Sequence, residues 1–238
     1  SCLSPAGSAC HGRKRRADRA REEETMITVI GSLKGGSGKS TVTFNLAVWL
    51  ALSGQRVLAI DLDPQATLTD VAYVRSEEGY KPKIRVIGRR EWAAGINYDD
   101  YDEVLVDVGT ADMESLKKAL LSADKIVVPV PPSQADVWST QRFTRYVNSI
   151  VSKLPKPPEV CAFINRVDMQ TAANESYETA AALVSLPGIR FLMPRLSQRP
   201  VFLHSFSEGL AAMELDPRDP GVREFNALAA EIYPHLIR

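Results

Sequence analysis

Eight consecutive residues combine two lysines, three closely spaced glycines and three hydroxyl side chains. The octet reads Lys34, Gly35, Gly36, Ser37, Gly38, Lys39, Ser40 and Thr41. The glycines let the backbone curl so that successive N–H groups point inward, and the positive end of a following helix adds to that field. Lys39 is placed to neutralise the β- and γ-phosphates, and the Ser40 hydroxyl to bind Mg²⁺. The octet therefore predicts a polyphosphate site.

The octet departs from the plain phosphate-loop pattern at one position. That pattern requires glycine five residues before Gly38, where this chain has Leu33. The alternative is a glycine-rich turn that binds nothing. An apolar run over 27–30 and a helix-forming run over 42–50 flank the octet, which gives the strand–loop–helix context that a phosphate loop requires.

Three carboxylates follow predicted strands. Asp61 and Asp63 come after the run 56–60, and Asp107 comes after the run 104–106. Carboxylates beside a polyphosphate hold Mg²⁺ directly or through water, and they orient the attacking water. A single aspartate after a strand is more often a helix cap or turn residue. Three aspartates together with a lysine-rich loop favour the functional interpretation.

These residues need a scaffold, and the chain supplies it as strand-like runs alternating with helical ones. The predicted strands are 27–30, 56–60, 84–87, 104–106, 126–130, 160–164 and 189–192. Helices are predicted over 112–122, 134–153 and 172–184, with a further helix toward the C-terminus that carries Val222, Phe225, Leu228, Ala229 and Ile232. This alternation predicts an α/β fold, a mostly parallel twisted sheet flanked by helices on both faces. Its ligands are expected at the carboxyl ends of the strands.

Composition limits the class of protein. The 238 residues are 45% apolar with a formal net charge of zero, which fits one large α/β domain and argues against a uniformly basic surface. Residues 1–25 lack hydrophobic periodicity and are rich in arginine, so they are predicted to be a disordered basic extension, or alternatively an arm that touches nucleic acid. Residues 26–238 are predicted to form a single phosphate-loop domain. Cys2, Cys10 and Cys161 form no disulfide or metal pattern.

Five segments together resemble the ParA/MinD superfamily of ATPases, whose deviant phosphate loop begins with a signature lysine. They are the octet, 61–65, 105–107, 127–133 and 163–166, in that order. The chain looks most like the short, ParF-like branch of ParA proteins, and residues 195–202 and 207–209 are similar to the C-terminal part of that branch. In the segment Asp107–Val108–Gly109–Thr110, the aspartate matches the family pattern, but the three residues after it do not match closely.

The resemblance implies roles for individual residues. Lys34 would reach across an ATP-sandwich dimer, Lys39 would bind phosphate in its own subunit, and Asp63 would position the hydrolytic water. Ser40, Asp61 and Asp107 would serve Mg²⁺, directly or through its waters. Asn165 would lie beside the adenine, with Arg166 next to it and Pro131 as another wall.

The resemblance also implies a cellular role. It predicts a DNA-segregation ATPase that dimerises on ATP, binds non-specific duplex DNA, is stimulated by a centromere-binding adaptor of the ParB or ParG kind, and resides in the cytoplasm on the nucleoid. The alternative is an ATPase that positions a protein assembly, with little DNA binding. Candidate DNA contacts are Arg190, Arg195 and Arg199, with Arg142 and Arg145 as a second set. No membrane association is expected, because the C-terminal helix carries Glu224 and Glu231 on its polar side.

Overall fold

The computed structural model describes residues 25–109, 111–168 and 173–237, so the predicted extension lies almost entirely outside the described residues. Strands and helices alternate along the chain. The strands are β1 (Met26–Ile30), β2 (Val57–Asp61), β3 (Arg85–Gly88), β4 (Glu103–Asp107), β5 (Lys125–Val130), β6 (Glu159–Ile164) and β7 (Arg190–Phe191). The helices are α2 (Lys39–Leu52), α3 (Thr67–Glu77), α4 (Arg89–Ala93), α5 (Met113–Ser122), α6 (Gln134–Val151), α7 (Ala173–Val184), α8 (Pro200–Ser207), α9 (Ala212–Leu215), α10 (Pro220–Ile232) and the 3-10 turn η1 (Pro234–Leu236).

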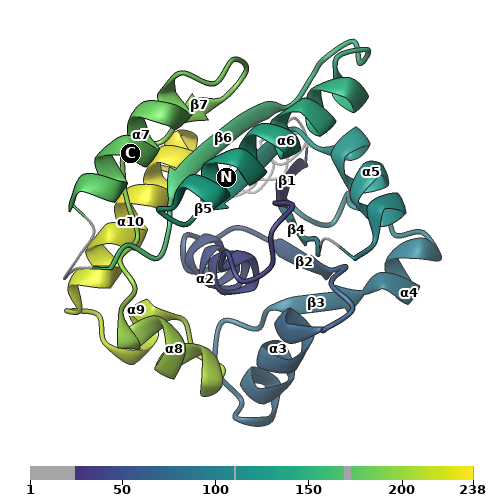
Figure 1. Ribbon diagram of the computed structural model, residues 1–238. Coiled ribbons are helices and arrows are strands. Elements are labelled where there is room, and N and C mark those ends of the chain that lie inside the picture. The colour runs from purple at the N-terminus through teal and green to yellow at the C-terminus, as the bar shows by residue number, and fades with distance from the viewer. Residues whose placement is uncertain (1–24, 110, 169–172, 238) are drawn as a thin grey trace, which may run out of the picture.

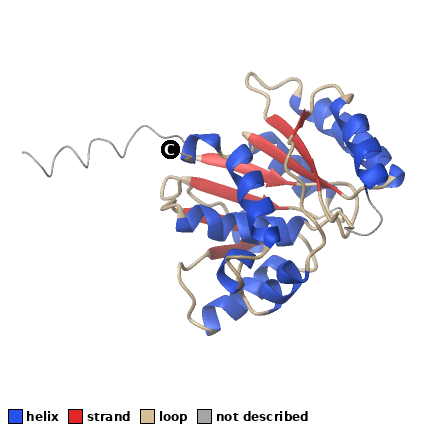
Figure 2. Cartoon of the chain, turned by 90° about the vertical axis from the view of Figure 1, so that its left-hand side faces the viewer, coloured by secondary structure: helices blue, strands red, loops and turns tan. Residues whose placement is uncertain are grey.

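The strands form one seven-stranded sheet in the order β3-β2-β4-β1-β5-β6-β7. Every pairing in it is parallel, which confirms the predicted fold class. Figure 1 shows helices on both sides of the sheet, and Figure 2 shows the strands side by side between the two helical layers. The predicted strand over 189–192 is shorter than expected, because only Arg190 and Phe191 pair with β6.

Side chains of each strand alternate between two cores, as the two-residue period of a strand requires. In β5, Ile126 and Val128 pack into the core under α5 and α6, whereas Val127 packs into the core under α2 and α10. Nearly all of the central strands are buried on both faces, so their sequences read as continuous apolar runs. The chain builds one half of the sheet from β1 through β2 and β3 and the other half through β5, β6 and β7, so the order switches beside β1. The octet follows β1 at this switch point, where ligands of such sheets bind.

A buried ion pair fixes the elements that surround the octet. Arg75 of α3 is 2% exposed and forms a two-pronged pair with Glu214 of α9, with both nitrogen–oxygen distances at 2.8 Å. Arg75 also donates to the carbonyl of Gly209. A Cβ on Gly209 would lie 2.6 Å from the backbone nitrogen of Arg75, so the turn between α8 and α9 approaches α3 as closely as glycine permits. The pair thereby fixes α8 and α9 relative to α3.

A buried acid lies at the amino-terminal ends of the strands, on the side of the sheet away from the octet. Its ionisation should change the free energy of unfolding with pH. Glu103 begins β4 and is 2% exposed, and its Oε2 has no hydrogen-bond partner among the described residues. Burial raises the pKa of Glu103 from 4.5 to about 8, and Lys125 opposes that shift only in part. Between those two values the folded protein holds a proton that the unfolded chain has released. Stability therefore falls as pH rises through this window.

We expect Glu103→Gln to remove this pH dependence. Measured by urea unfolding from pH 5 to pH 8, wild-type protein should lose stability relative to the variant as pH rises. His235 lies 3.5 Å from Glu103, so the comparison is repeated in a His235→Asn background to separate the contribution of the imidazole from that of the carboxyl. Parallel profiles for wild type and Glu103→Gln would contradict the assignment.

Candidate functional site

The octet forms the turn between β1 and α2, and two of its glycines adopt backbone conformations that disfavour other residues. Gly36 has φ of 73° and Gly38 has φ of 89°, both in the left-handed region. A Cβ on Gly38 would also lie 2.5 Å from Nδ2 of Asn165. The loop then enters α2 at Lys39, so the positive end of that helix and the backbone N–H groups of the loop lie together.

Two residues that follow β6 hold this loop from outside. Nδ2 of Asn165 donates to the carbonyl of Ser37 at 2.7 Å, and the Arg166 guanidinium donates to the carbonyl of Gly36. Both carbonyls therefore point away from the inner side of the loop. Asn165 and Arg166, predicted from the sequence as ATP-binding residues, thus contact the phosphate loop itself.

Asp107 is the most exceptional side chain of the site. It is fully buried, and neither carboxylate oxygen has a hydrogen-bond partner among the described residues. Burial raises the pKa of the Asp107 carboxyl to about 7, opposed by the neighbouring Ser40 hydroxyl, whose geometry falls short of a hydrogen bond, and by the positive charge of Lys39. A buried carboxylate without a partner is unfavourable unless a cation or a proton compensates it. Asp107 and Ser40 therefore fit a divalent cation.

Asp61 is placed differently, although it ends the neighbouring strand in register with Asp107. Its Oδ2 accepts hydrogen bonds from the N–H and the hydroxyl of Thr69 at 2.8 and 2.9 Å, and its Oδ1 accepts from the N–H of Asp63. Burial raises the pKa of Asp61 and the bonds from Thr69 lower it in part. Asp61 is thus already satisfied by the start of α3, which favours a role through water over direct binding of the metal.

Asp63 lines a cavity of about 510 Å³ together with Lys39 and Ser40. Its Oδ1 accepts from the N–H of Gln65 at 2.9 Å. Its other oxygen packs against Gly109, where an added Cβ would lie 2.6 Å away. Gly109 lies in the segment 107–110, which does not closely match the ParA/MinD pattern after its aspartate. Because Gly109 has no side chain, the Asp63 carboxylate can lie against it. Thr110 lies outside the described residues.

Lys34 does not line that cavity. Its Nζ lies 2.8 Å from Oδ1 of Asp136, which is buried in the first turn of α6 and whose other oxygen contacts the Ser133 hydroxyl. Lys34 is half exposed and borders a separate depression of about 330 Å³ with Gly35 and Pro131. In the single protomer, therefore, the two lysines of the octet lie at different cavities.

A further cavity of about 290 Å³ lies on the other side of the loop. It is bordered by Gly38, Thr41 and Asn165 on one side and by apolar residues of α8 on the other, namely Phe202, Leu203 and Phe206. Pro131, predicted as a wall of the base site, borders the 330 Å³ depression with Lys34 and does not border this cavity. Its role toward the base stays a prediction.

Sequence reasoning missed several residues of the site. Thr69, Asp136 and the α8 aromatics were not predicted. Asp136 carried a usable signal, because it stands three residues after Ser133 in the pattern of a helix cap. Thr69 carried no such signal in the sequence, because only the packing of the start of α3 against the end of β2 brings Thr69 to Asp61. Among the described residues there is no cluster of three or more metal-binding side chains.

The three arginines predicted to contact DNA each contact a different neighbour. Arg190 pairs with Glu159 at 2.5 Å, Arg199 pairs with Glu224 at 2.9 Å, and the Arg195 guanidinium lies 5.3 Å from the centre of the Tyr177 ring. Arg199 also borders the 290 Å³ cavity. The structure therefore does not bring these arginines together as one patch of unpaired charge.

Comparison with known proteins agrees with this geometry. The family model described as the CobQ/CobB/MinD/ParA nucleotide binding domain matches residues 28–209. The chain belongs to this family. That confirms the superfamily predicted from the octet and the strand-end carboxylates, whereas the finer placement in a ParF-like branch stays a prediction.

Individual relatives differ in their cellular roles. The chain is 24% identical over 210 residues to the maintenance of carboxysome distribution protein A of Halothiobacillus neapolitanus, covering 86% of this chain and 95% of that protein. It is 30% identical over 142 residues to the chromosome-partitioning ATPase Soj of Thermus thermophilus, covering 47% of this chain and about half, 56%, of Soj. The family is thus one of partition or positioning ATPases.

A solved structure shows the same fold. The putative plasmid partition protein of Borrelia burgdorferi, bound to AMPPNP, superposes with a TM-score of 0.68 at 21% identity, covering 90% of this chain and all of that one. Among the described residues, no helix has both the length and the apolar character needed to cross a bilayer.

Proposed function

We propose that this protein is a Mg²⁺-dependent ATPase that segregates DNA, dimerising on ATP and releasing on hydrolysis. The observation that carries the nucleotide part is the buried, unpartnered carboxylate of Asp107 next to the first turn of α2, where Lys39 and Ser40 follow the glycine loop. A bound Mg²⁺ would be held by Ser40 and Asp107 and would neutralise phosphate charge. The triphosphate would occupy the 510 Å³ cavity, and the base the 290 Å³ cavity.

Asp63 and Lys34 would have different roles in hydrolysis. Asp63 lines the triphosphate cavity and accepts only one hydrogen bond from protein among the described residues, so its remaining oxygen can orient a water molecule. Lys34 lies outside that cavity in its own subunit. A partner subunit would supply it in trans, which makes turnover depend on dimerisation.

The DNA part of the proposal rests on the kinship to partition proteins, and a second function competes with it. The similarity to the carboxysome distribution protein spans 95% of that relative, which favours positioning of a protein assembly as the alternative. In either case an adaptor would stimulate hydrolysis. We propose a cytoplasmic, nucleoid-associated location for the first function, and one independent of the nucleoid for the second.

Two measurements test these functions. By calorimetry, the purified protein should bind ATP with Mg²⁺, and Lys39→Ala should lose that binding because the phosphate charge is no longer neutralised. By fluorescence anisotropy, random-sequence duplex DNA should bind with ATP and not with ADP. Absence of ATP binding would overturn the ATPase, whereas ATP binding and dimerisation without DNA binding would overturn segregation in favour of positioning.

A further inference from the structure

The outer face of α6 carries a run of positive charge in a protein whose net charge is zero. From residue 137 to residue 158 the sequence contains no aspartate and no glutamate. The same stretch contains four cations, two on α6 and two in the loop after it: Arg142, Arg145, Lys153 and Lys156. We call these four residues, together with Trp138, the α6 outer face.

All four cations are exposed, and none forms an ion pair with a residue that the structure describes. Arg145 makes only a 3.4 Å hydrogen bond to the Gln141 carbonyl of its own helix. The nearest acid after them, Glu159, is already paired with Arg190. This differs from Arg190 and Arg199, whose charge is neutralised within the protein.

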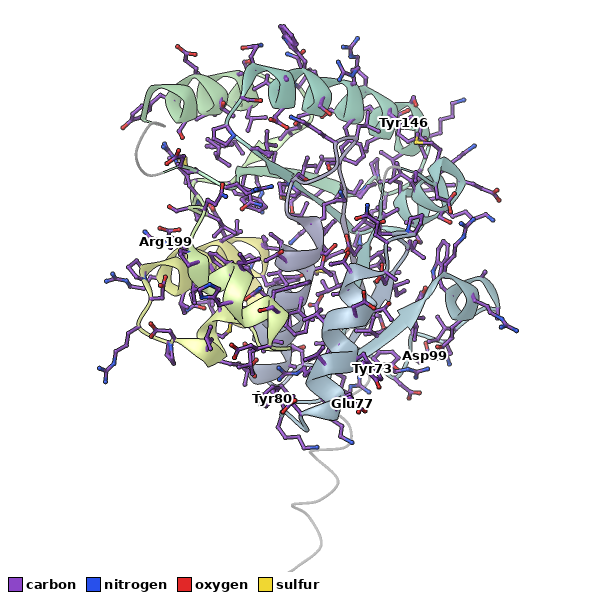
Figure 3. The ribbon with its side chains drawn as sticks, turned by 60° about the horizontal axis from the view of Figure 1, so that its bottom comes forward. Tyr73, Glu77, Tyr80, Asp99, Tyr146 and Arg199 are labelled. Atoms are coloured by element: carbon purple, nitrogen blue, oxygen red, sulfur yellow. The ribbon has the colours of Figure 1, made fainter. Side chains whose placement is uncertain are left out.

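An aromatic side chain extends the same face. Trp138 is 54% exposed, and residues three and four apart on a helix lie on one side, so Trp138, Arg142 and Arg145 form one row. In Figure 3, α6, marked by Tyr146, lies in the outermost layer of the molecule, far from Arg199. Lys153 and Lys156 follow in the loop after the helix.

We propose that the α6 outer face contacts the phosphate backbone of duplex DNA. A linear series of unpaired cations without intervening acids complements a linear series of phosphates, and such contacts require no base-reading side chains. The spread of the cations from Arg142 to Lys156 favours an extended polyanion, with a charge at every phosphate, over a short acidic peptide. This inference rests on the DNA-binding part of the proposed function and moves the contact surface away from Arg190, Arg195 and Arg199.

The position of α6 also explains why DNA binding would require ATP. Asp136 in the first turn of α6 contacts Lys34, the residue proposed to enter the partner's site. A dimer formed at the two Lys34 loops therefore brings the beginnings of both α6 helices to the shared interface. Each protomer contributes four cations, and the dimer offers both rows to one duplex.

The test is the double variant Arg142→Glu/Arg145→Glu, measured by anisotropy with ATP and random duplex at several salt concentrations. A dimer would lose four phosphate contacts, so the slope of log affinity against log salt should flatten by about 3 to 4, and affinity should fall at least about tenfold. The matched control is Lys83→Glu/Arg90→Glu, which makes the same change in charge at exposed, unpaired residues near β3, at the other end of the sheet. The control should bind as wild type does.

Trp138 gives a second signal, because Trp49 and Trp92 are only partly exposed. DNA should change the tryptophan fluorescence of wild type but not of Trp138→Phe. Wild-type affinity and slope in the double variant, or an equal loss in the control, would overturn the α6 assignment while leaving DNA binding intact. A wild-type protein that dimerises with ATP yet binds no duplex would overturn the DNA role itself. Basal ATP turnover should be unchanged in both charge variants.

Discussion

Replacing Lys34 with alanine is expected to lower ATP turnover by about 10³- to 10⁵-fold, the range over which an added cation accelerates phosphoryl transfer. ATP-dependent dimerisation should weaken as well, because the same ammonium group would join the two subunits. ATP binding to the monomer should change little, since Lys34 contacts Asp136 and does not line the cavity that holds Lys39 and Ser40. Turnover by phosphate release and mass by light scattering measure the two effects.

Subunit mixing distinguishes a role in trans from a role in cis. A Lys34→Ala subunit keeps its own Asp63, and an Asp63→Asn partner can supply the missing lysine. Mixing the two inactive variants should therefore restore one working site per mixed dimer. If Lys34 acts within its own subunit, the mixture stays as inactive as each variant alone. Lys118→Ala, which removes an exposed lysine on α5, is the control for loss of charge and should keep wild-type turnover.

The sequence was sufficient to predict the layers of the fold and the edge at which the site lies. Central strands such as β5 are buried on both faces, so their continuous apolar runs could be recognised without any partner. Glycine spacing identified the phosphate loop, because Gly36 and Gly38 adopt backbone conformations that few other residues tolerate. Asp61 and Asp107 were predicted to lie together because both end strands of a parallel sheet, and they are in register.

What the sequence could not give depends on contacts between distant segments. The helix α3 was not predicted, because its residues are mostly polar and only Leu68, Val71 and Arg75 are buried. Its position depends on Glu214, 139 residues away. Likewise, Asp61 and Asp107 differ because Thr69 donates hydrogen bonds to Asp61, whereas Asp107 has no hydrogen-bond partner among the described residues.

The second large effect is expected at Asp63. Asp63→Asn keeps the shape of the side chain but removes the charge that would orient and polarise the attacking water, so turnover should fall by about 10²- to 10⁴-fold. ATP affinity should stay within a few-fold of wild type, because Lys39 and the loop remain. ATP dimers should therefore accumulate. Single-turnover hydrolysis together with light scattering separates this variant from Lys34→Ala, whose ATP-dependent dimers should be weaker than those of wild type.

Gly109→Ala tests the same carboxylate without altering it. The added Cβ would lie 2.6 Å from Oδ2 of Asp63, so the carboxylate has to move. A displacement of about 1 Å at a reacting group costs about 10² in rate, and we expect that loss here with ATP binding retained. Gly88→Ala is the matched control, because a Cβ there meets nothing within 4 Å. Normal turnover in Gly109→Ala would show that Asp63 does its work from another position, and that the close contact with Gly109 has no part in hydrolysis.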